Sequence, residues 1–144
     1  MYPSRNQNRH YACEITFHLL ILVMYKIWGK VRIGNQRGKK LGFPTANITL
    51  RKNIPEGIYI SKTKIKNKIH PSLTFIGRAI TFNEKELKAE TYLLSLGKNL
   101  YSTWISVHLL KKIRENIKFR SANDLIKQME KDKKDTLEYF RRNV

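Results

Sequence analysis

The chain has 144 residues, of which 41% are hydrophobic and 28% are charged. This composition excludes a disordered chain and fits one globular domain with a buried core. The 29 basic and 11 acidic residues give a formal charge of +18, which favours polyanionic partners such as nucleic acid, anionic membrane or phosphorylated ligands. Because the basic residues are spread along the chain and Lys outnumbers Arg, a general coding bias explains the charge equally well.

The single cysteine, Cys13, excludes an intrachain disulfide and fits a reducing compartment, so we expect a cytoplasmic protein.

Residues 1–24 differ from the rest of the chain. Residues 15–25 form an apolar run of about 11 residues, whereas a helix that spans a bilayer needs about 20. No small-residue cleavage site follows the run, which argues against a signal peptide. A buried strand or a misassigned start both explain it, and we expect no membrane partner. We predict one domain over residues 25–144, preceded by an N-terminal extension of doubtful status.

Short runs with alternating or β-rich composition follow residue 25, separated by turn signals at intervals of roughly a dozen residues. A hairpin is predicted within residues 56–70, turning near Lys66 and Asn67. This spacing predicts an antiparallel barrel or sandwich over about residues 25–119 and argues against alternating strands and helices. The five runs cover residues 25–34, 56–70, 71–77, 88–97 and 101–113.

The end of the chain is predicted to be a helix over about residues 121–141. Ser121 is the expected N-cap residue, and Asp124 occupies the position where a capping box has Glu or Gln. The apolar residues indicate that one face of the helix packs against the barrel. These residues are Leu125, Met129, Leu137 and Phe140.

The sequence GNQRGKKLGFPTAN, residues 34–47, is the most unusual segment of the chain. It is not a Walker A loop, because only three residues separate its first two glycines and Lys40 stands where Ser or Thr is required. The chain also has no GxGxxG sequence and no Cys or His spacing typical of zinc sites. Glycines in this segment would allow backbone amides to approach an anion, and its basic side chains would neutralise it.

Thr45 and Asn47 add two oxygen ligands to this segment. In an extended chain, residues two positions apart point to the same side, so both oxygens could bind one Mg²⁺ ion. That ion commonly takes only one or two protein ligands and completes its shell with phosphate and water. The alternative is a basic surface turn whose Thr and Asn side chains bond to their own backbone. The residues alone leave these two interpretations open.

The same region resembles the signature of the riboflavin kinases, including the kinase half of the bacterial bifunctional enzymes that make FMN and then FAD. The resemblance begins with GKVRIGNQRGKKLGFPTANI and continues in order over about residues 25–140. Its later parts are PEGIY, FIGRAITF, AETYLLSLGKNLYSTWISV and IRENIKF, followed by Leu125, Gln128 and Asp132 in the terminal helix.

The resemblance implies a mainly β fold, a six-stranded antiparallel Greek-key barrel with a C-terminal α-helix. It implies transfer of the ATP γ-phosphoryl group to the 5′-hydroxyl of riboflavin, with riboflavin and MgATP as partners and Mg²⁺ as cofactor. Glu90 matches the catalytic glutamate and would act as general base, while Thr45 and Asn47 would bind Mg²⁺. The residues expected to bind nucleotide are Gly34, Arg37, Gly38, Lys39, Lys40, Gly42, Pro44, Thr45 and Tyr101, and those expected to bind flavin are Glu90, Arg114 and Phe119.

The chain departs from the family pattern at several positions, mostly on the flavin side. The His-x-Gly-His motif of the adenylyltransferase module is also absent, so we do not expect FAD synthesis by this chain. We expect a monomer. The departures are Ile80, Tyr92, Ser95, Leu96 and Ser102.

Two other functions compete with the kinase. The charge and the interspersed Tyr and Trp residues fit a small basic β-barrel that binds RNA, and the departures fit a flavin-binding relative with weakened catalysis. A nucleic-acid barrel has no need of Pro44, Thr45 and Asn47 followed by an isolated Glu90. We therefore favour the kinase and do not expect nucleic acid as a partner.

Overall fold

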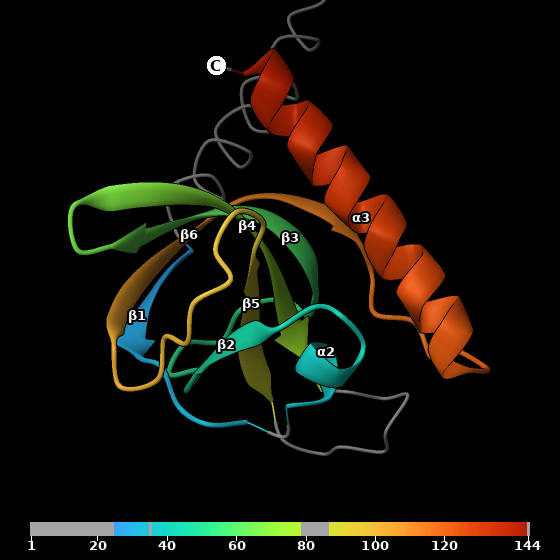
Figure 1. Cartoon of the computed structure of the whole chain (residues 1–144), viewed down its shortest axis with the longest axis horizontal. Helices are drawn as coiled ribbons and strands as arrows, with labels where there is room; N and C mark the ends of the chain where they lie inside the picture. Colours follow the sequence, from blue (N-terminus) through green and yellow to red (C-terminus); the bar gives the residue numbers. More distant parts are fainter. Residues whose placement is uncertain (1–24, 35, 79–86, 144) are drawn as a thin grey trace, which may run out of the picture.

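The computed structural model describes residues 25–34, 36–78 and 87–143, and shows a curled sheet with a long helix at its side (Figure 1). The position of Ile80 lies outside these residues, as does the N-terminal extension. Six antiparallel strands form one sheet in the order β1-β6-β3-β4-β5-β2. The elements are β1 (Lys26–Lys30), α2 (Arg37–Lys40), β2 (Thr45–Ile48), β3 (Gly57–Ile65), β4 (Lys68–Gly77), β5 (Lys88–Leu93), β6 (Trp104–Arg114) and α3 (Ala122–Arg142).

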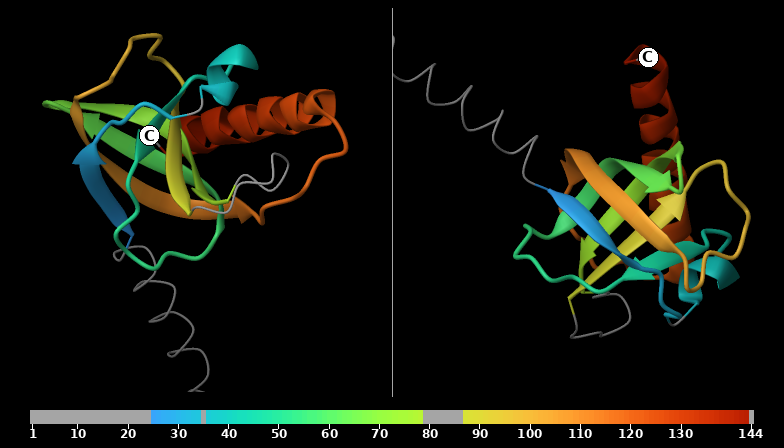
Figure 2. Two further views of the ribbon diagram at one scale, coloured as in Figure 1. Left: turned by 90° about the horizontal axis from the view of Figure 1, so that it is seen from below. Right: turned by 90° about the vertical axis from the view of Figure 1, so that its left-hand side faces the viewer.

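The two edges of the sheet approach each other, so that it curls into a half-barrel (Figure 2). The amide of Arg32, just after β1, donates a hydrogen bond of 2.9 Å to the carbonyl of Asn47 in β2. This single bridge joins the first and last strands of the order. The predicted mainly β barrel fold with a C-terminal helix is therefore confirmed.

The strand pattern differs from the sequence prediction in two places. Lys66 has a φ of 52° and turns the β3–β4 hairpin as predicted, but residues 56–70 and 71–77 are not separate runs, because β4 continues through Pro71. Pro71 precedes the ladder between β4 and β5, which begins at Ser72, and its carbonyl accepts a 3.2 Å hydrogen bond from the amide of Leu94. A proline is tolerated where the strand needs no amide donor. Strand β2 is not among the five predicted runs, because four residues are too few to display alternation.

The inner face of the sheet forms the core. Ile76, Ala89, Ile105 and Val107 are at most 1% exposed. A row of buried hydroxyl groups crosses β3, β4 and β5 on the same inner face, with hydrogen bonds of 2.8–2.9 Å that satisfy each group. Its members are Ser61, Thr63, Ser72, Thr74 and Thr91.

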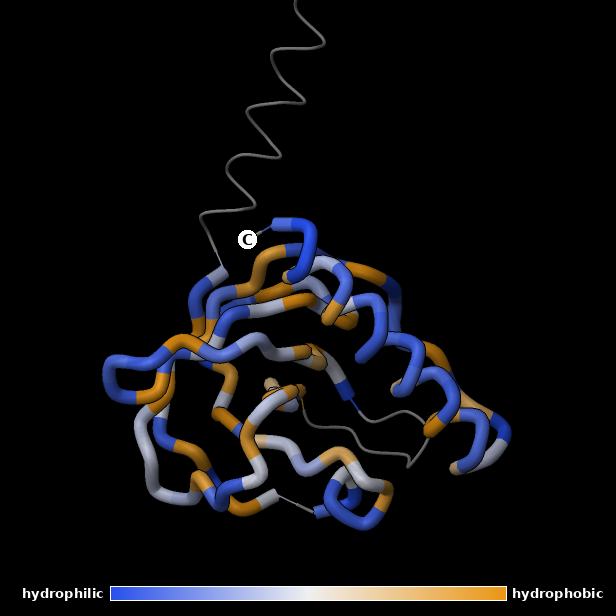
Figure 3. The backbone as a smooth tube through the Cα atoms, turned by 45° about the horizontal axis from the view of Figure 1, so that its top comes forward, coloured by the Kyte–Doolittle hydropathy of each residue, from blue (hydrophilic) through white to orange (hydrophobic). Residues whose placement is uncertain are grey.

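Helix α3 packs against β4 and begins as the sequence predicts, because the Ser121 hydroxyl accepts a 3.2 Å hydrogen bond from the amide of Asp124. The predicted packing face is wrong at Leu137, which is 50% exposed. The buried positions are Asp132 and Thr136 instead. Since these continue the 3.6-residue period from Met129, Leu137 lies about 100° around the helix from Thr136. Figure 3 shows that α3 is mostly hydrophilic, whereas hydrophobic and hydrophilic residues alternate along the strands.

Candidate active site

A pocket of about 160 Å³ opens on the outer face of the sheet, next to the pair β2 and β5. One side of the pocket is formed by α2, and the other side by the segment after β6 together with the first half of α3. Most of its wall is apolar. Its polar end lies where β2 meets β5, and further polar side chains, among them Arg114, Asn116 and Asp132, line the side formed by the segment after β6 and α3. The apolar wall consists of Leu41, Ile58, Leu73, Phe75, Ile117, Phe119, Leu125 and Met129.

Thr45, Asn47 and Glu90 meet at the polar end of this pocket. In β2 the side chains of Ala46 and Ile48 are buried in the core, so Thr45 and Asn47 point to the opposite face. Asn47 lies directly across from Glu90 in the β2–β5 ladder, and the Thr45 hydroxyl donates a long hydrogen bond of 3.4 Å to a carboxylate oxygen of Glu90. The predicted same-side arrangement of Thr45 and Asn47 is present, and Glu90 joins it.

Because Gly34 has no side chain, the side chain of Asn47 can lie directly against it. A Cβ atom built on Gly34 would collide with the side-chain amide of Asn47. The main chain of Asn47 is held at the same time by the hydrogen bond from the amide of Arg32. The absence of a side chain at Gly34 therefore makes room for Asn47 in the site, whether or not the Gly34 amide also binds a ligand.

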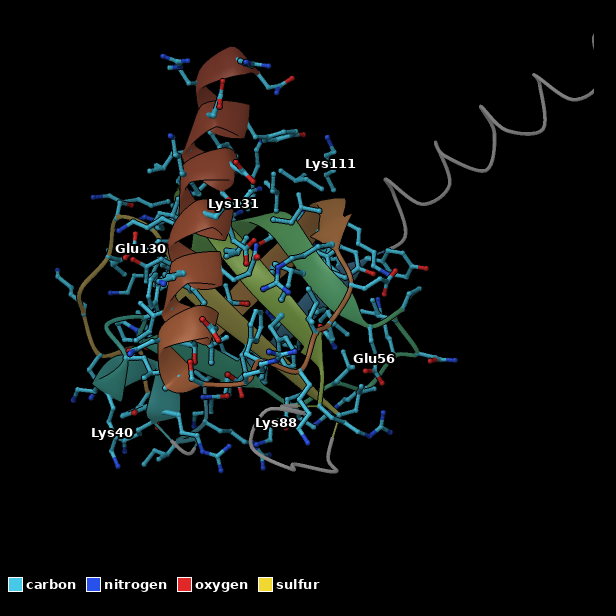
Figure 4. The ribbon with its side chains drawn as sticks, turned by 90° about the vertical axis from the view of Figure 1, so that its right-hand side faces the viewer. Lys40, Glu56, Lys88, Lys111, Glu130 and Lys131 are labelled. Atoms are coloured by element: carbon cyan, nitrogen blue, oxygen red, sulfur yellow. The ribbon has the colours of Figure 1, made fainter. Side chains whose placement is uncertain are left out.

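The remaining residues expected to bind nucleotide lie on or around α2, which is a single helical turn. Arg37 and Gly38 line the pocket. Lys39 and Lys40 are exposed, and Lys40 points away from the sheet (Figure 4). Gly42 has a φ of 90°, in the left-handed region.

Pro44 is exposed, and it does not contribute to the wall of this pocket. Tyr101 lies elsewhere as well, since it packs against the hydrophobic core. It follows Leu100 in the β5–β6 connection, where the next residue, Ser102, has a φ of 64°. Ser102 is one of the departures from the family pattern, and its left-handed conformation is one that glycine adopts without strain.

Arg114 and Phe119, expected to contact flavin, line the side of the pocket formed by the segment after β6 and α3. The Arg114 guanidinium binds the Asp132 carboxylate through two nitrogens, at 3.0 Å and 2.7 Å, and lies 5.8 Å from the centre of the Phe119 ring. The amide nitrogen of Gln128 donates a further 2.9 Å hydrogen bond to Asp132. Asp132 is only 2% exposed, so this pair fixes the end of β6 to α3.

Asn116 is a pocket residue that the sequence patterns did not single out. Its amide nitrogen donates to the carbonyl of Ile76 at 3.2 Å and to the carboxylate of Glu56 at 3.3 Å. The pairing of Arg114 with Asp132 was also missed. Both contacts join distant segments, and no local pattern signals them.

The chain is similar in sequence to known proteins. The family model described as riboflavin kinase matches residues 22–140. A bifunctional riboflavin kinase/FMN adenylyltransferase of Haemophilus influenzae is 35% identical over 119 residues, covering 81% of this chain and 39% of that protein. The curated relatives that the chain matches are much longer, and it spans between 19% and 39% of their length.

Two solved structures are similar in fold. A macrolide-efflux protein from Streptococcus pneumoniae has a TM-score of 0.71 at 26% identity, over 85% of this chain and 45% of that one. A riboflavin kinase from Trypanosoma brucei has a TM-score of 0.56 at 23% identity, over 81% of this chain and 79% of that one. Among the described helices, none is long and apolar enough to cross a bilayer.

Proposed function

The chain belongs to the riboflavin kinase family, and from this premise we propose that it transfers the γ-phosphoryl group of ATP to the 5′-hydroxyl of riboflavin, giving FMN. The observation that carries the proposal is the meeting of Thr45, Asn47 and Glu90 at the polar end of an apolar pocket. An apolar wall suits a flat aromatic ring system, and the convergent oxygens suit the end at which a phosphoryl group is transferred.

Glu90 is proposed as the general base. A primary alcohol is a poor nucleophile near neutral pH, and a carboxylate that accepts its proton assists the attack. Glu90 is held in the ladder opposite Asn47 and accepts a hydrogen bond from Thr45, so its position is restrained. The remainder of the catalysis comes from in-line positioning and neutralisation of phosphate charge.

The oxygens of Thr45 and Asn47 are proposed to hold Mg²⁺. They fit this ion chemically, because both are hard, uncharged ligands, and a metal that bridges substrate phosphates needs few ligands from the protein. In agreement, the part of the chain that the structure describes contains no group of three or more acidic, His or Cys side chains that would hold a metal by itself. When bound, the ion would neutralise charge on the phosphates.

The two ends of the pocket are proposed to receive different substrates. Arg37 and Gly38, together with the amides near Gly34, would face the phosphates of ATP from the α2 side. The isoalloxazine ring of riboflavin would lie against the apolar wall near Arg114 and Phe119. A contact between Tyr101 and the nucleotide stays a prediction.

Incubation of the purified chain with riboflavin, ATP and MgCl₂ tests the proposal, with FMN separated by chromatography. We expect FMN, loss of FMN when EDTA replaces Mg²⁺, and a large loss in Thr45→Ala. Riboflavin binding without FMN formation would support the weakened relative instead. A chain that neither binds riboflavin nor forms FMN would overturn the proposal.

A further inference from the structure

A second surface, remote from the pocket, carries two exposed tryptophans. Trp28 in β1 is 63% exposed and Trp104 in β6 is 51% exposed. Their rings are stacked, with centroids 4.2 Å apart and planes at 23°. Large aromatic side chains rarely stay this exposed without a partner, and a contiguous aromatic surface commonly marks a binding site.

The strand register places both rings on the outer face of the sheet. Trp28 lies opposite Ser106, and Trp104 lies opposite Lys30, so the two rings are diagonal neighbours across β1 and β6. Ile27 and Ile105, which adjoin Trp28 and Trp104 in the chain, point into the core. The stack is therefore fixed by two paired strands, which leave the outer sides of the rings free to accept another flat group.

Lysines surround the stack on the same outer face. Lys26 and Lys62 lie on either side of His108 in the ladder, and Lys64 and Trp28 lie on either side of Ser106. Lys30 lies beside Trp104. Within the described part of the chain, none of these four lysines forms an ion pair. We name this surface, formed by Trp28, Trp104, Lys26, Lys30, Lys62, Lys64 and His108, the tryptophan face.

The charge of the tryptophan face is segregated from the acidic residues of the chain. Strands β1, β3, β4 and β6 contain no Asp or Glu. Five of the 11 acidic residues lie on α3 instead, at positions 124, 130, 132, 135 and 138. The field of this face also acts on His108, whose pKa is lowered by burial and by the nearby charges of Lys26, Lys64 and Lys62.

Against the expectation from the sequence that nucleic acid is not a partner, we propose that the tryptophan face binds single-stranded nucleic acid, with bases stacked on the tryptophan rings and phosphates beside the lysines. Exposed aromatic rings between basic residues are the combination that single strands require, because every base has a flat face and every phosphate a negative charge. An apolar protein partner would leave the four lysines without counter-charges. Duplex bases are already stacked and cannot reach the rings.

Binding of a fluorescein-labelled single-stranded RNA of about 12 nucleotides, a length within the usual site sizes, tests the proposal by fluorescence anisotropy. DNA of the same sequence and the corresponding duplex are measured beside it. We expect both single strands to bind, the duplex to bind more weakly, and affinity to fall with KCl with a log–log slope of about −3 for four phosphate contacts. Failure of both single strands to bind would overturn the proposal.

Two double variants separate this site from the general charge of the chain. Lys62→Gln/Lys64→Gln and Lys127→Gln/Lys134→Gln remove the same charge, but the second pair is exposed on α3. We expect the first variant to reduce the magnitude of the salt slope by about 1.4 and the second to leave it unchanged. Equal effects of the two variants would show attraction by net charge alone and contradict the proposal.

Trp28→Ala/Trp104→Ala tests the stacking. We expect a loss of affinity of at least about fivefold, the lower limit for one stacked base. FMN formation by the same variant reports that it folds and should equal that of the unmodified chain, because neither tryptophan lines the pocket. Unchanged RNA affinity in this variant, or self-association of the unmodified chain that this variant abolishes in sedimentation, would overturn the proposal. If the unmodified chain forms no FMN but binds single-stranded RNA, the proposed kinase activity is contradicted and the proposed nucleic-acid site is not.

Discussion

The outer face of the sheet has two halves, which are built from the same antiparallel strands but are covered differently. Over β4, β5 and β2, which we call the covered half, the outer side chains meet α2 and α3, and the pocket lies between them. Over β1 and the first part of β6, which we call the open half, most outer side chains reach solvent, although Ser106 is buried. Two tryptophans of this half cover one another. Strand alternation determines which residues point outward on both halves. Whether an outward residue becomes part of a pocket or part of an open surface depends on what packs above it.

The covered half depends most on the ion pair between Arg114 and Asp132. Asp132→Asn would leave the guanidinium without its charged partner, and we expect a loss of about 3 kcal/mol in the free energy of unfolding, the lower end for a buried pair because Arg114 retains some solvent contact. Asp135→Asn is the matched control on the same helix. It breaks an exposed pair with Lys131 and should cost less than about 1 kcal/mol. Urea denaturation measures both, and equal losses would show that this pair does not hold α3 to the sheet.

Gly34 offers a smaller change within the covered half. Gly34→Ala would push its new methyl group against the side chain of Asn47, and we expect a destabilisation of about 1–3 kcal/mol, as for other overpacked sites, together with a raised requirement for Mg²⁺ in FMN formation. Gly97→Ala is the control, because a Cβ atom there meets nothing within 4 Å. A Gly34→Ala chain that forms FMN at the normal Mg²⁺ concentration would show that the position of Asn47 is not critical.

The smallest expected effect belongs to the open half and concerns His108. Burial and three lysines lower its pKa below the ordinary 6.5, so the unfolded chain takes up a proton before the folded chain does. The contribution of neutral His108 to the free energy of unfolding is therefore fully present above pH 6.5. It is lost as the pH falls through that value toward the lowered pKa of the folded chain. We expect His108→Gln to flatten the decline of unfolding free energy between about pH 7.5 and about pH 5.5. An unchanged slope in this variant would exclude His108 as the cause.

Most of the strand pattern and part of the covered half could be predicted from the sequence, because their signals are local. The spacing of Thr45 and Asn47 determined that their side chains share a face, and Ser121 marked the start of α3. The turn at Lys66 and the strands around Ile27, Glu90 and Val107 followed from composition and alternation. Bringing Glu90 to Thr45 required the family resemblance, since no pattern in either segment shows that β5 pairs with β2.

The features that escaped prediction depend on contacts between distant segments. Asp132 reads as a solvated helix residue until Arg114, 18 residues earlier, is placed beside it. Leu137 was expected to pack because it is apolar, yet Thr136 occupies the buried position and donates its hydroxyl to the carbonyl of Asp132 at 2.7 Å. The stack of Trp28 on Trp104 likewise follows only from the pairing of β1 with β6.

The most direct test of the proposed kinase compares the rate of FMN formation in Glu90→Gln and in Glu130→Gln. Glu130 is an exposed residue of α3 (Figure 4) and does not line the pocket, so it controls for loss of one negative charge. With riboflavin and MgATP at saturation, we predict that Glu90→Gln lowers kcat by about 10²- to 10⁴-fold, the usual contribution of a general base, while riboflavin binding is retained. Glu130→Gln should match the unmodified chain. A Glu90→Gln chain that forms FMN at the same rate as Glu130→Gln would contradict the assignment of Glu90 and the site built around it.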